Sequence, residues 1–271
     1  MVKIMDEIAV VIPAYNCEDC IRSTLESINS QTAVKNIKSI IVVDDGSTDD
    51  TYLKIVSYKK ESRIPLQVIH KANGGVSTAR NLGVQNAGDV KWIAFCDADD
   101  IWKSNKIERQ LEVLQDNEQI DALGGDFDDK GLRILGKKIE ELHKGNVKEI
   151  LIQNYPQPST VIIKKKIFDA IGGFDEKQKY AEDGNFFLKV AQKYNLYYLP
   201  EKLIEYGAGK RGFGVKGLSA NLRGMYEGNI KNIREMRKAH YISSLYYYFI
   251  YLLQVLKYFR RIVITMINHE Q

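Results

Sequence analysis

The apolar run Trp92-Ile93-Ala94-Phe95-Cys96 passes directly into the acidic segment Asp97-Ala98-Asp99-Asp100. A short apolar run that ends at a turn predicts a strand buried inside a sheet. Similar runs cover residues 8–12, 39–43 and 66–69. The chain is therefore predicted to build a sheet from several short, buried strands.

Helical segments separate these predicted strands. Ile21, Leu25 and Ile28 recur with the spacing of one helix face, and residues 76–86 also read as a helix. Strands that alternate with helices predict an α/β fold, with a mostly parallel central sheet and helices on both faces. A chain of 271 residues is long enough for one such domain, with or without a helical appendage.

Polar clusters follow three of the predicted strands. Pro13-Ala14-Tyr15-Asn16 follows the first, Asp44-Asp45 the second, and Asp97-Ala98-Asp99-Asp100 the fourth. Ligands bind at the carboxyl ends of parallel strands because the loops and helix N-termini gather there. We therefore expect these clusters to share one ligand site.

The acids after the fourth strand suit a divalent metal ion. Asp97 and Asp99 stand on alternate residues. Mg²⁺ and Mn²⁺ prefer oxygen ligands and take one or two carboxylates, with water and substrate phosphate completing the shell. The alternative is a solvated acidic turn that caps a helix beginning near Lys106.

Two other loops admit both a ligand and a structural role. Asp44-Asp45-Gly46-Ser47 offers hydrogen-bond acceptors to a base or a ribose, whereas Ser47 with Asp50 predicts a helix N-cap. Gly74-Gly75 precedes a predicted helix whose first N–H groups suit an anion. Arg80, one turn further on, serves either the same anion or an ion pair with a nearby Asp.

Five segments, taken in order, resemble the family 2 glycosyltransferases of the GT-A fold, which has a Rossmann-like sheet. They cover roughly the first two hundred residues. They are Val11-Ile12-Pro13-Ala14-Tyr15-Asn16, Val42-Val43-Asp44-Asp45-Gly46-Ser47-Thr48-Asp49, Gly74-Gly75-Val76-Ser77-Thr78-Ala79-Arg80-Asn81, Asp97-Ala98-Asp99-Asp100 and Ala181-Glu182-Asp183.

The resemblance implies a pocket for a nucleotide-sugar donor. Within it, Asp44 would contact the base, and Asp97 and Asp99 would contact the ribose and a Mn²⁺ or Mg²⁺ ion. The implied donor-binding residues are Pro13, Ala14, Tyr15, Asn16, Glu18, Asp44, Gly74, Gly75, Ser77, Arg80, Asp97, Ala98 and Asp99.

The resemblance also implies a catalytic base, Asp183, at the start of a helix predicted over residues 182–194. Acids at a helix N-terminus are equally explained by the helix dipole. The implied acceptor-binding residues are Ser159, Thr160, Phe174 and Glu182, although residues 159–163 and 171–175 also read as strand and turn. Lys210 and Arg211, among glycines, would form a basic loop over the diphosphate.

The implied activity is inverting transfer of one sugar, from a nucleoside-diphosphate sugar of the UDP type, to a hydroxyl of a saccharide or a lipid-linked saccharide in surface polysaccharide synthesis. Processive synthases carry Gln-x-x-Arg-Trp, which neither Trp92 nor Trp102 completes. Two rival classes stay open: a nucleotidyltransferase that makes nucleotide sugars, and a catalytically silent binding protein with this fold.

The tail differs from the rest of the chain. From Leu199 onward, 12 Lys and Arg stand against 5 Asp and Glu, so the basic charge lies there. The chain shows no base-reading motif, so we expect anionic lipid rather than nucleic acid as its partner. We expect a catalytic domain over residues 1–215, with its donor part in 1–105 and its acceptor part in 106–215, and a helical extension over 216–271.

The stretch 241–256 is uncharged and holds five tyrosines, but it is shorter than the roughly 20 residues that span a bilayer. It predicts an interfacial helix, with an ordinary helix packed on the core as the alternative. The N-terminus has no secretory pattern and the three cysteines are odd in number, so we expect a cytoplasmic protein, peripheral on the inner membrane face. The choice between monomer and homodimer stays open. Cys17-Glu18-Asp19-Cys20 has redox spacing, but we interpret these cysteines as packing beside the nucleotide loop.

Overall fold

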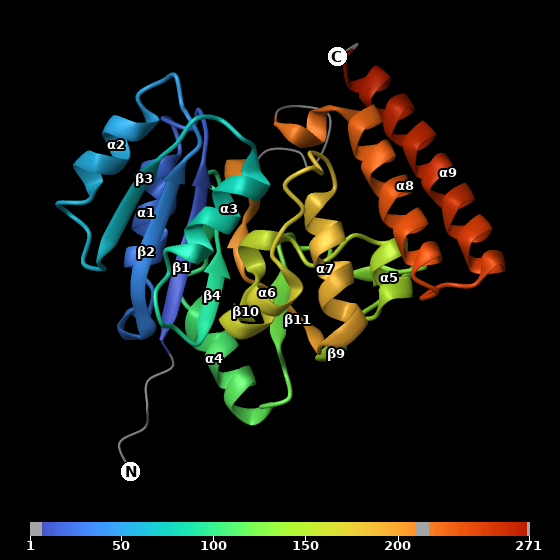
Figure 1. Cartoon of the computed structure of the whole chain (residues 1–271), viewed down its shortest axis with the longest axis horizontal. Coiled ribbons are helices and arrows are strands. Elements are labelled where there is room, and N and C mark those ends of the chain that lie inside the picture. The colour runs from blue at the N-terminus through green and yellow to red at the C-terminus, as the bar shows by residue number, and fades with distance from the viewer. Residues whose placement is uncertain (1–6, 210–216, 270–271) are drawn as a thin grey trace.

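The computed structural model describes residues 7–209 and 217–269. Its centre is an eight-stranded sheet with the strand order β3-β2-β1-β4-β10-β6-β11-β9 (Figure 1). β10 and β9 are antiparallel to their neighbours, and the other strands share one direction. The predicted mostly parallel sheet is therefore confirmed. Its strands are β1 (Ile8–Ala14), β2 (Ile37–Asp44), β3 (Leu66–His70), β4 (Trp92–Phe95), β6 (Ala122–Asp126), β9 (His143–Lys144), β10 (Ile162–Lys164) and β11 (Leu196–Lys202).

Helices cover both faces of the sheet (Figure 1). On β1, Val10 and Ile12 pack with α1, α2 and α4, whereas Ala9 and Val11 pack with α3, α6 and α7. Every residue of β1 is buried, which explains its uninterrupted apolar sequence. The helices of these layers are α1 (Ile21–Asn29), α2 (Thr51–Tyr58), α3 (Val76–Gln85), α4 (Lys106–Asp116), α5 (Val147–Ile152), α6 (Lys165–Ile171) and α7 (Glu182–Lys193).

Short elements fill the connections between these layers. β12 pairs antiparallel with β5, and β7 with β8. Their bounds are β5 (Ile101–Trp102), β7 (Arg133–Ile134), β8 (Lys137–Lys138) and β12 (Ile204–Glu205), with the 3₁₀ helices η1 (Val34–Asn36), η2 (Pro158–Thr160), η3 (Tyr206–Gly209) and η4 (Leu218–Ala220).

Two local predictions were wrong. Ser47 does not cap α2, which begins at Thr51; its hydroxyl instead donates a hydrogen bond to Asp44, 2.5 Å away. Residues 159–163 do not form one strand, because Pro158 starts the 3₁₀ helix η2 and the strand β10 begins only at Ile162. In both places a side-chain or proline turn replaces the regular element that the sequence pattern predicted.

The predicted tail forms two long helices, α8 (Leu222–Lys238) and α9 (Ser244–His269), which lie side by side against the α5 and α7 end of the sheet (Figure 1). Ile233, Met236 and Ile250 are almost fully buried and share one hydrophobic cluster with residues of the sheet and α7. The two helices therefore complete the core on this side. Among the described residues, no helix combines the length and hydropathy needed to cross a bilayer.

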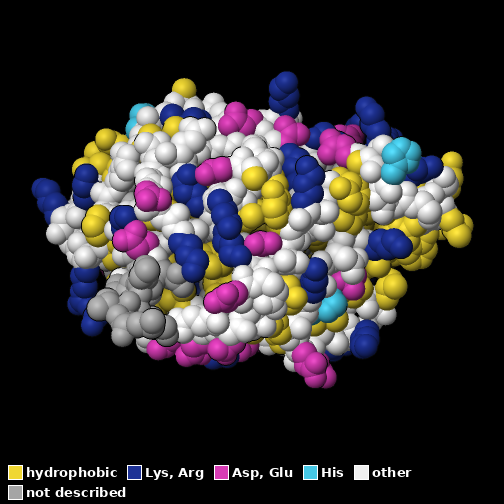
Figure 2. All heavy atoms as spheres, turned by 60° about the horizontal axis from the view of Figure 1, so that its bottom comes forward, with side chains coloured by type: hydrophobic (Ala, Val, Ile, Leu, Met, Phe, Trp, Pro, Cys, Tyr) yellow, Lys and Arg dark blue, Asp and Glu magenta, His cyan; other side chains and the backbone are white. Residues whose placement is uncertain are grey.

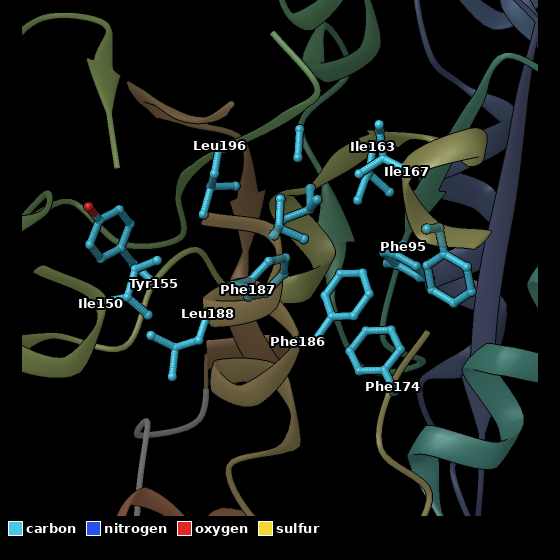
Figure 3. Packing of buried hydrophobic residues seen from close by; sticks show 14 of the residues in the cluster. Phe95, Ile150, Tyr155, Ile163, Ile167, Phe174, Phe186, Phe187, Leu188 and Leu196 are labelled. Carbon is cyan, nitrogen blue, oxygen red and sulfur yellow. The ribbon is translucent and has the colours of Figure 1, made fainter. Parts of the chain in front are cut away.

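An aromatic cluster joins the sheet to α7. The rings of Phe174 and Phe186 stack with centroids 4.2 Å apart, and Phe95 of β4 meets both rings edge-on (Figure 3). Aromatic pairs of this geometry add to the free energy of burial. The cluster fixes the start of α7 relative to the end of β4, and both of these ends border the cavity described next.

Candidate active site

A cavity of about 940 Å³ opens at the carboxyl ends of β1, β2 and β4. Its far wall comes from α5, α7, α8 and α9. The structure brings together in this one cavity many residues that the sequence had marked. They are Pro13, Ala14, Tyr15, Asn16, Gly75, Arg80, Asp97, Ala98, Asp99, Glu182 and Asp183.

The loops after β1 and β2 hold each other in place. The Asn16 side chain accepts a hydrogen bond from the backbone N–H of Thr48 at 2.9 Å, and the Asn16 N–H donates to the Ser47 hydroxyl at 3.0 Å. Gly46 has φ +74°, and a Cβ there would lie 2.8 Å from the backbone nitrogen of Asn73. A glycine is therefore required where the loop after β2 meets the loop after β3.

Asp45 anchors the glycine loop before α3. Its carboxylate accepts hydrogen bonds from the N–H groups of Gly74 at 2.9 Å and Gly75 at 2.7 Å, and it also pairs with Lys71. These N–H groups are thus already occupied by a protein carboxylate. Gly75 and Asp45 both line the cavity, so the loop shapes the cavity wall as a fixed element.

Asp44, expected at the base, is fully buried and lies outside the cavity lining. Its carboxylate accepts from the Ser47 hydroxyl at 2.5 Å and lies 2.6 Å from the His70 ring nitrogen. Six other expected site residues also lie outside the lining: Glu18, Gly74, Ser77, Ser159, Thr160 and Phe174. Lys210 and Arg211 fall outside the described residues.

Arg80 connects the two halves of the site. Its guanidinium donates to Asp97 at 2.7 Å and to Glu182 at 3.1 Å, and it lies over the Phe174 ring at 5.0 Å. Burial opposes its charge, but Asp97 and Glu182 outweigh burial and raise the pKa of Arg80. Of the two roles open for Arg80, the structure shows the ion pair with an Asp. Phe174, a member of the aromatic cluster, packs against the Arg80 guanidinium.

The acidic turn after β4 is fixed by its third acid. Asp100 is fully buried and accepts from the Ser159 hydroxyl at 2.5 Å, from Gln157 at 2.9 Å and from the Gly207 N–H at 2.6 Å. The Ser159 hydroxyl also accepts from the Asp97 N–H at 2.8 Å. Burial and then Asp97 raise the pKa of Asp100 to about 7. Asp100 and Ser159 therefore position the turn that presents the other two acids.

Asp97 and Asp99 fit a divalent cation held together with a phosphate ligand. Both line the cavity, and one oxygen of Asp97 is taken by Arg80. Among the described residues, no group of three or more His, Cys, Asp or Glu converges to hold a metal ion. Two carboxylates suffice when substrate phosphate supplies further oxygen ligands, which is the usual arrangement for Mg²⁺.

The start of α7 carries an unusual backbone turn. Ala181, directly before Glu182, is fully buried at φ +54°, a left-handed conformation that costs a non-glycine residue free energy. The Ala181 carbonyl accepts from the Asn232 side chain of α8 at 3.0 Å. α8 approaches so closely that a Cβ on Gly228 would lie 2.2 Å from the Tyr180 carbonyl oxygen. α8 thus holds the turn in place.

Asp183 faces the cavity with partners on both oxygens. It accepts from the Gly184 N–H at 2.7 Å and from the Asn154 side chain at 3.1 Å. Burial raises the pKa of Asp183 despite these hydrogen bonds and the nearby Arg80 charge. Burial and then Asp183 raise the pKa of the adjacent Glu182 to about 7. Perturbed carboxyl groups in a cavity are typical of acid–base catalysis.

Sequence reasoning missed the residues that tertiary packing adds to the cavity wall. Asn154 and Gln157 come from loops and Tyr206 from the 3₁₀ helix η3, and none of these segments carries a chemical motif. Lys257 and Arg261 come from α9. The spacing of Lys257 and Arg261 would have placed them on one helix face. No feature of the sequence shows that this face turns toward the acids.

The cysteine pair shows no activated thiol. Cys17 and Cys20 line the cavity, and the three cysteines, all of which lie among the described residues, form no disulfide. The hydrogen bond with Cys20 and burial raise the pKa of Cys17. A raised pKa leaves the thiol protonated and poorly nucleophilic. The cysteines therefore act as packing residues beside the loop after β1.

The sheet is mostly parallel and has a polar cavity at its strand ends, lined by an acidic turn and by the adjacent carboxylates Glu182 and Asp183. This is the architecture of α/β proteins that bind ligands at this edge of the sheet. Residues 9–171 match the family model described as Glycosyl transferase family 2. The chain belongs to this family, and the resemblance drawn from its motifs is confirmed.

Curated relatives and solved structures agree with the family. The chain is 31% identical over 206 residues to an uncharacterized glycosyltransferase of Rickettsia prowazekii. The match covers 73% of this chain and 63% of that protein. It is 41% identical over 111 residues to the Escherichia coli UDP-Glc:alpha-D-GlcNAc-diphosphoundecaprenol beta-1,3-glucosyltransferase WfaP, over 41% of this chain and 42% of that one. The chain spans 30% to 63% of the length of its first curated relatives.

Two solved structures share the fold. Residues 1–349 of S. aureus TarS superpose with a TM-score of 0.69 at 22% identity, over 92% of this chain and 70% of that one. The mannosyltransferase PcManGT from Pyrobaculum calidifontis, solved with GDP-Man and Mn²⁺, superposes with a TM-score of 0.68 at 18% identity. The match covers 86% of this chain and 64% of that one. The GT-A fold class is thereby confirmed.

Proposed function

We propose that this chain is a glycosyltransferase that moves one sugar from a nucleoside-diphosphate sugar to a hydroxyl group of a saccharide acceptor, with inversion at the anomeric carbon. One observation carries the proposal. The acidic turn of Asp97 and Asp99 and the half-buried carboxylate Asp183 line one cavity, and Arg80 connects them through Asp97 and Glu182. We therefore assign the donor to the wall at the strand ends and the acceptor to the wall of helices.

Asp183 acts as the general base. The acceptor hydroxyl has a high pKa, so a carboxylate must take its proton as the oxygen attacks the anomeric carbon. Burial raises the pKa of Asp183 toward that of the group it serves. The Gly184 N–H and the Asn154 amide fix the carboxylate orientation. A single displacement by this route inverts the anomeric configuration.

Asp99, with Asp97, holds a Mn²⁺ or Mg²⁺ ion. When bound, such an ion stabilises the negative charge that develops on the departing diphosphate. Arg80 keeps one oxygen of Asp97 engaged and Ser159 holds the Asp97 N–H, so the turn presents its carboxylates in one orientation. A preorganised turn avoids the cost of ordering these acids during the reaction.

We further propose a UDP-sugar donor and a lipid-linked saccharide acceptor. TarS has been solved with UDP and with UDP-GlcNAc, and WfaP is named as acting on a GlcNAc-diphosphoundecaprenol acceptor. These names belong to the relatives. They support the substrate classes for this chain through the shared family.

α9 would place the enzyme against an anionic membrane surface, where such an acceptor resides. Hydrophobic side chains gather at the end of the molecule where α8 passes into α9 (Figure 2). Along α9 the exposed apolar residues recur at helical spacing, which is typical of an interfacial helix. They are Leu245, Tyr248, Phe249, Leu252, Leu256, Phe259, Val263, Met266 and Ile267.

This surface is tested by substitution, not truncation, because Ile250 of α9 is fully buried and its removal would open the core. Leu256→Gln with Phe259→Gln should release the protein from vesicles that contain anionic lipid, measured by cosedimentation. The matched control is Leu53→Gln, an exposed residue of α2 at the opposite end of the fold. Unchanged sedimentation of the double variant would contradict the membrane contact.

The activity is tested with a panel of nucleotide sugars and Mn²⁺ or Mg²⁺, by following release of the nucleoside diphosphate. The expected result is metal-dependent hydrolysis or transfer with a UDP-sugar. A parallel incubation with a sugar phosphate and a nucleoside triphosphate examines nucleotidyl transfer. Product in the second assay alone would replace the proposed function with that activity, and binding without turnover would indicate a silent protein.

A further inference from the structure

The tail contributes cations to the inside of the active-site cavity. Lys257 and Arg261 of α9 line the cavity together with Gln254. The three residues are three and four positions apart, so they share one face of the helix. The exposed apolar stripe that contains Leu252 and Phe259 lies on a different face. One helix therefore presents apolar groups outward and cations inward.

Hydrogen bonds tie this basic face to the acceptor side of the cavity. Gln254 donates to the Leu151 carbonyl at 2.9 Å, and Lys257 donates to the Ile152 carbonyl and to the Gln153 side chain. The next residue along the loop is Asn154, which contacts Asp183. Lys257 is thus connected to the proposed base, whereas the donor loops lie at the strand ends across the cavity.

The cations repel one another in this position. Burial and then the charges of Arg261 and Arg260 lower the pKa of Lys257 to about 8. Burial and Arg260 also lower the pKa of Arg261. The two oxygens that receive hydrogen bonds from Lys257 are neutral, and an ammonium group has three donors. An anion bound here would offset both the repulsion and the cost of burial.

We propose that Lys257 and Arg261 form a subsite for the diphosphate of a lipid-linked acceptor, with its prenyl chain leaving along the apolar stripe of α9. The inference rests on the proposed transferase function and names the chemistry of its acceptor. A diphosphate joined to an apolar chain matches a helix with a basic inner face and an apolar outer face. Arg261 supplies a planar fork of donors suited to phosphate oxygens.

Binding of farnesyl diphosphate to the full-length protein tests the subsite without turnover. Calorimetry is carried out with saturating UDP and Mg²⁺, so that the donor wall is occupied. Lys257→Gln and Arg261→Gln should each weaken binding about tenfold or more, equivalent to about 1.4 kcal/mol. Lys257→Arg, which keeps the positive charge, should retain most of the affinity for farnesyl diphosphate. The matched control, Arg223→Gln on the exposed side of α8, should bind as the parent does.

Two ligand controls identify the source of the anion. Farnesol should bind much more weakly than farnesyl diphosphate, which would support the basic subsite. Inorganic pyrophosphate that binds as tightly as farnesyl diphosphate would overturn the lipid-linked assignment in favour of a free anion. Gln at position 257 keeps a donor for the Ile152 carbonyl. Thermal unfolding of each variant separates lost binding from lost folding.

Three further results would overturn the inference: no binding of farnesyl diphosphate by the parent, equal binding by parent and variants, or a loss of UDP affinity as large as the loss of farnesyl diphosphate affinity. The last result would assign the cations to the donor. Failure of the proposed function has a different signature, because absent sugar transfer with intact, Lys257-dependent binding would refute the chemistry alone.

Discussion

The two walls of the cavity were built in different ways. The wall at the strand ends comes from short loops that directly follow β1, β2 and β4. The opposite wall comes from α5, α7, α8 and α9, which lie much further along the chain, from Val147 onward, and meet only through packing. Motifs in sequence report the first wall, whereas the second depends on contacts between distant helices.

The largest effect is expected at Asp183, the residue of the helical wall that we propose as the general base. Asp183→Asn keeps the shape and the Asn154 contact but removes the proton acceptor, so turnover should fall at least about a hundredfold. The affinity for the nucleotide sugar, measured by calorimetry, should stay nearly intact. Turnover equal to that of the parent would show that Asp183 is not the base. The base would then belong to the strand-end wall or to the substrate.

Asp99 tests the strand-end wall in the same assay. Asp99→Ala removes a carboxylate that we propose as a metal ligand, so the stimulation of activity by Mn²⁺ or Mg²⁺ should be lost. Asp116→Ala, an acid at the end of α4 outside the cavity, serves as the control. A parent enzyme with full activity in a chelator would contradict the metal mechanism.

Gly228 tests whether α8 supports the active site from behind. A Cβ there would lie 2.2 Å from the Tyr180 carbonyl oxygen, so Gly228→Ala must displace either α8 or the turn at Ala181. We expect a loss of about 1–3 kcal/mol in the free energy of unfolding, typical of overpacking, and a fall in turnover of about tenfold. Denaturant unfolding and steady-state kinetics measure both effects.

The control for Gly228→Ala is Arg234→Ala, an exposed position on the same helix, which should change stability by no more than about 0.5 kcal/mol. Unfolding and kinetics like those of the parent in Gly228→Ala would show that the turn at Ala181 does not depend on α8.

The smallest effect is expected at Asn154, which tests whether its hydrogen bond to Asp183 sets the pH dependence of the reaction. Asp183 is inactive as a base when protonated, so the rate should rise with pH through its raised pKa. The Asn154 hydrogen bond favours the charged carboxylate. Asn154→Ala should therefore move the acidic limb of the pH–rate profile upward by less than about one unit, and Asn154→Asp should move it further. A limb that stays in place in both variants would contradict the assignment of that limb to Asp183.

Much of the strand-end wall was predictable because its signals are local. The apolar run before Asp97 had to be a buried strand, and an acid that follows such a strand must lie at the sheet edge. The GT-A fold and the family follow from several such segments in order. The role of Arg80 as an ion-pair partner was one of two readings that the sequence allowed.

Some interpretations of the strand-end wall needed the structure. Asp44 was expected at the base; the structure shows its carboxylate buried beside Ser47 and His70, and its contact with a donor stays a prediction. Ser159 and Phe174 were expected to contact the acceptor, which stays a prediction; the structure shows Ser159 bonded to Asp100 and Phe174 in contact with Arg80. A sequence gives the residue type and its neighbours along the chain, but the direction of a side chain depends on which distant group satisfies it.

The sequence by itself determined the first four strands of the sheet, the polar loops that follow them and the family, because hydrophobic periodicity and turn residues act over a few positions. Only the tertiary structure decided that the basic tail closes the cavity, with Lys257 and Arg261 facing inward. The physical reason is that the burial of Ile233, Met236 and Ile250 against α5 and α7 fixes the rotation of α8 and α9. That rotation is set by the shape of a surface assembled from the whole chain.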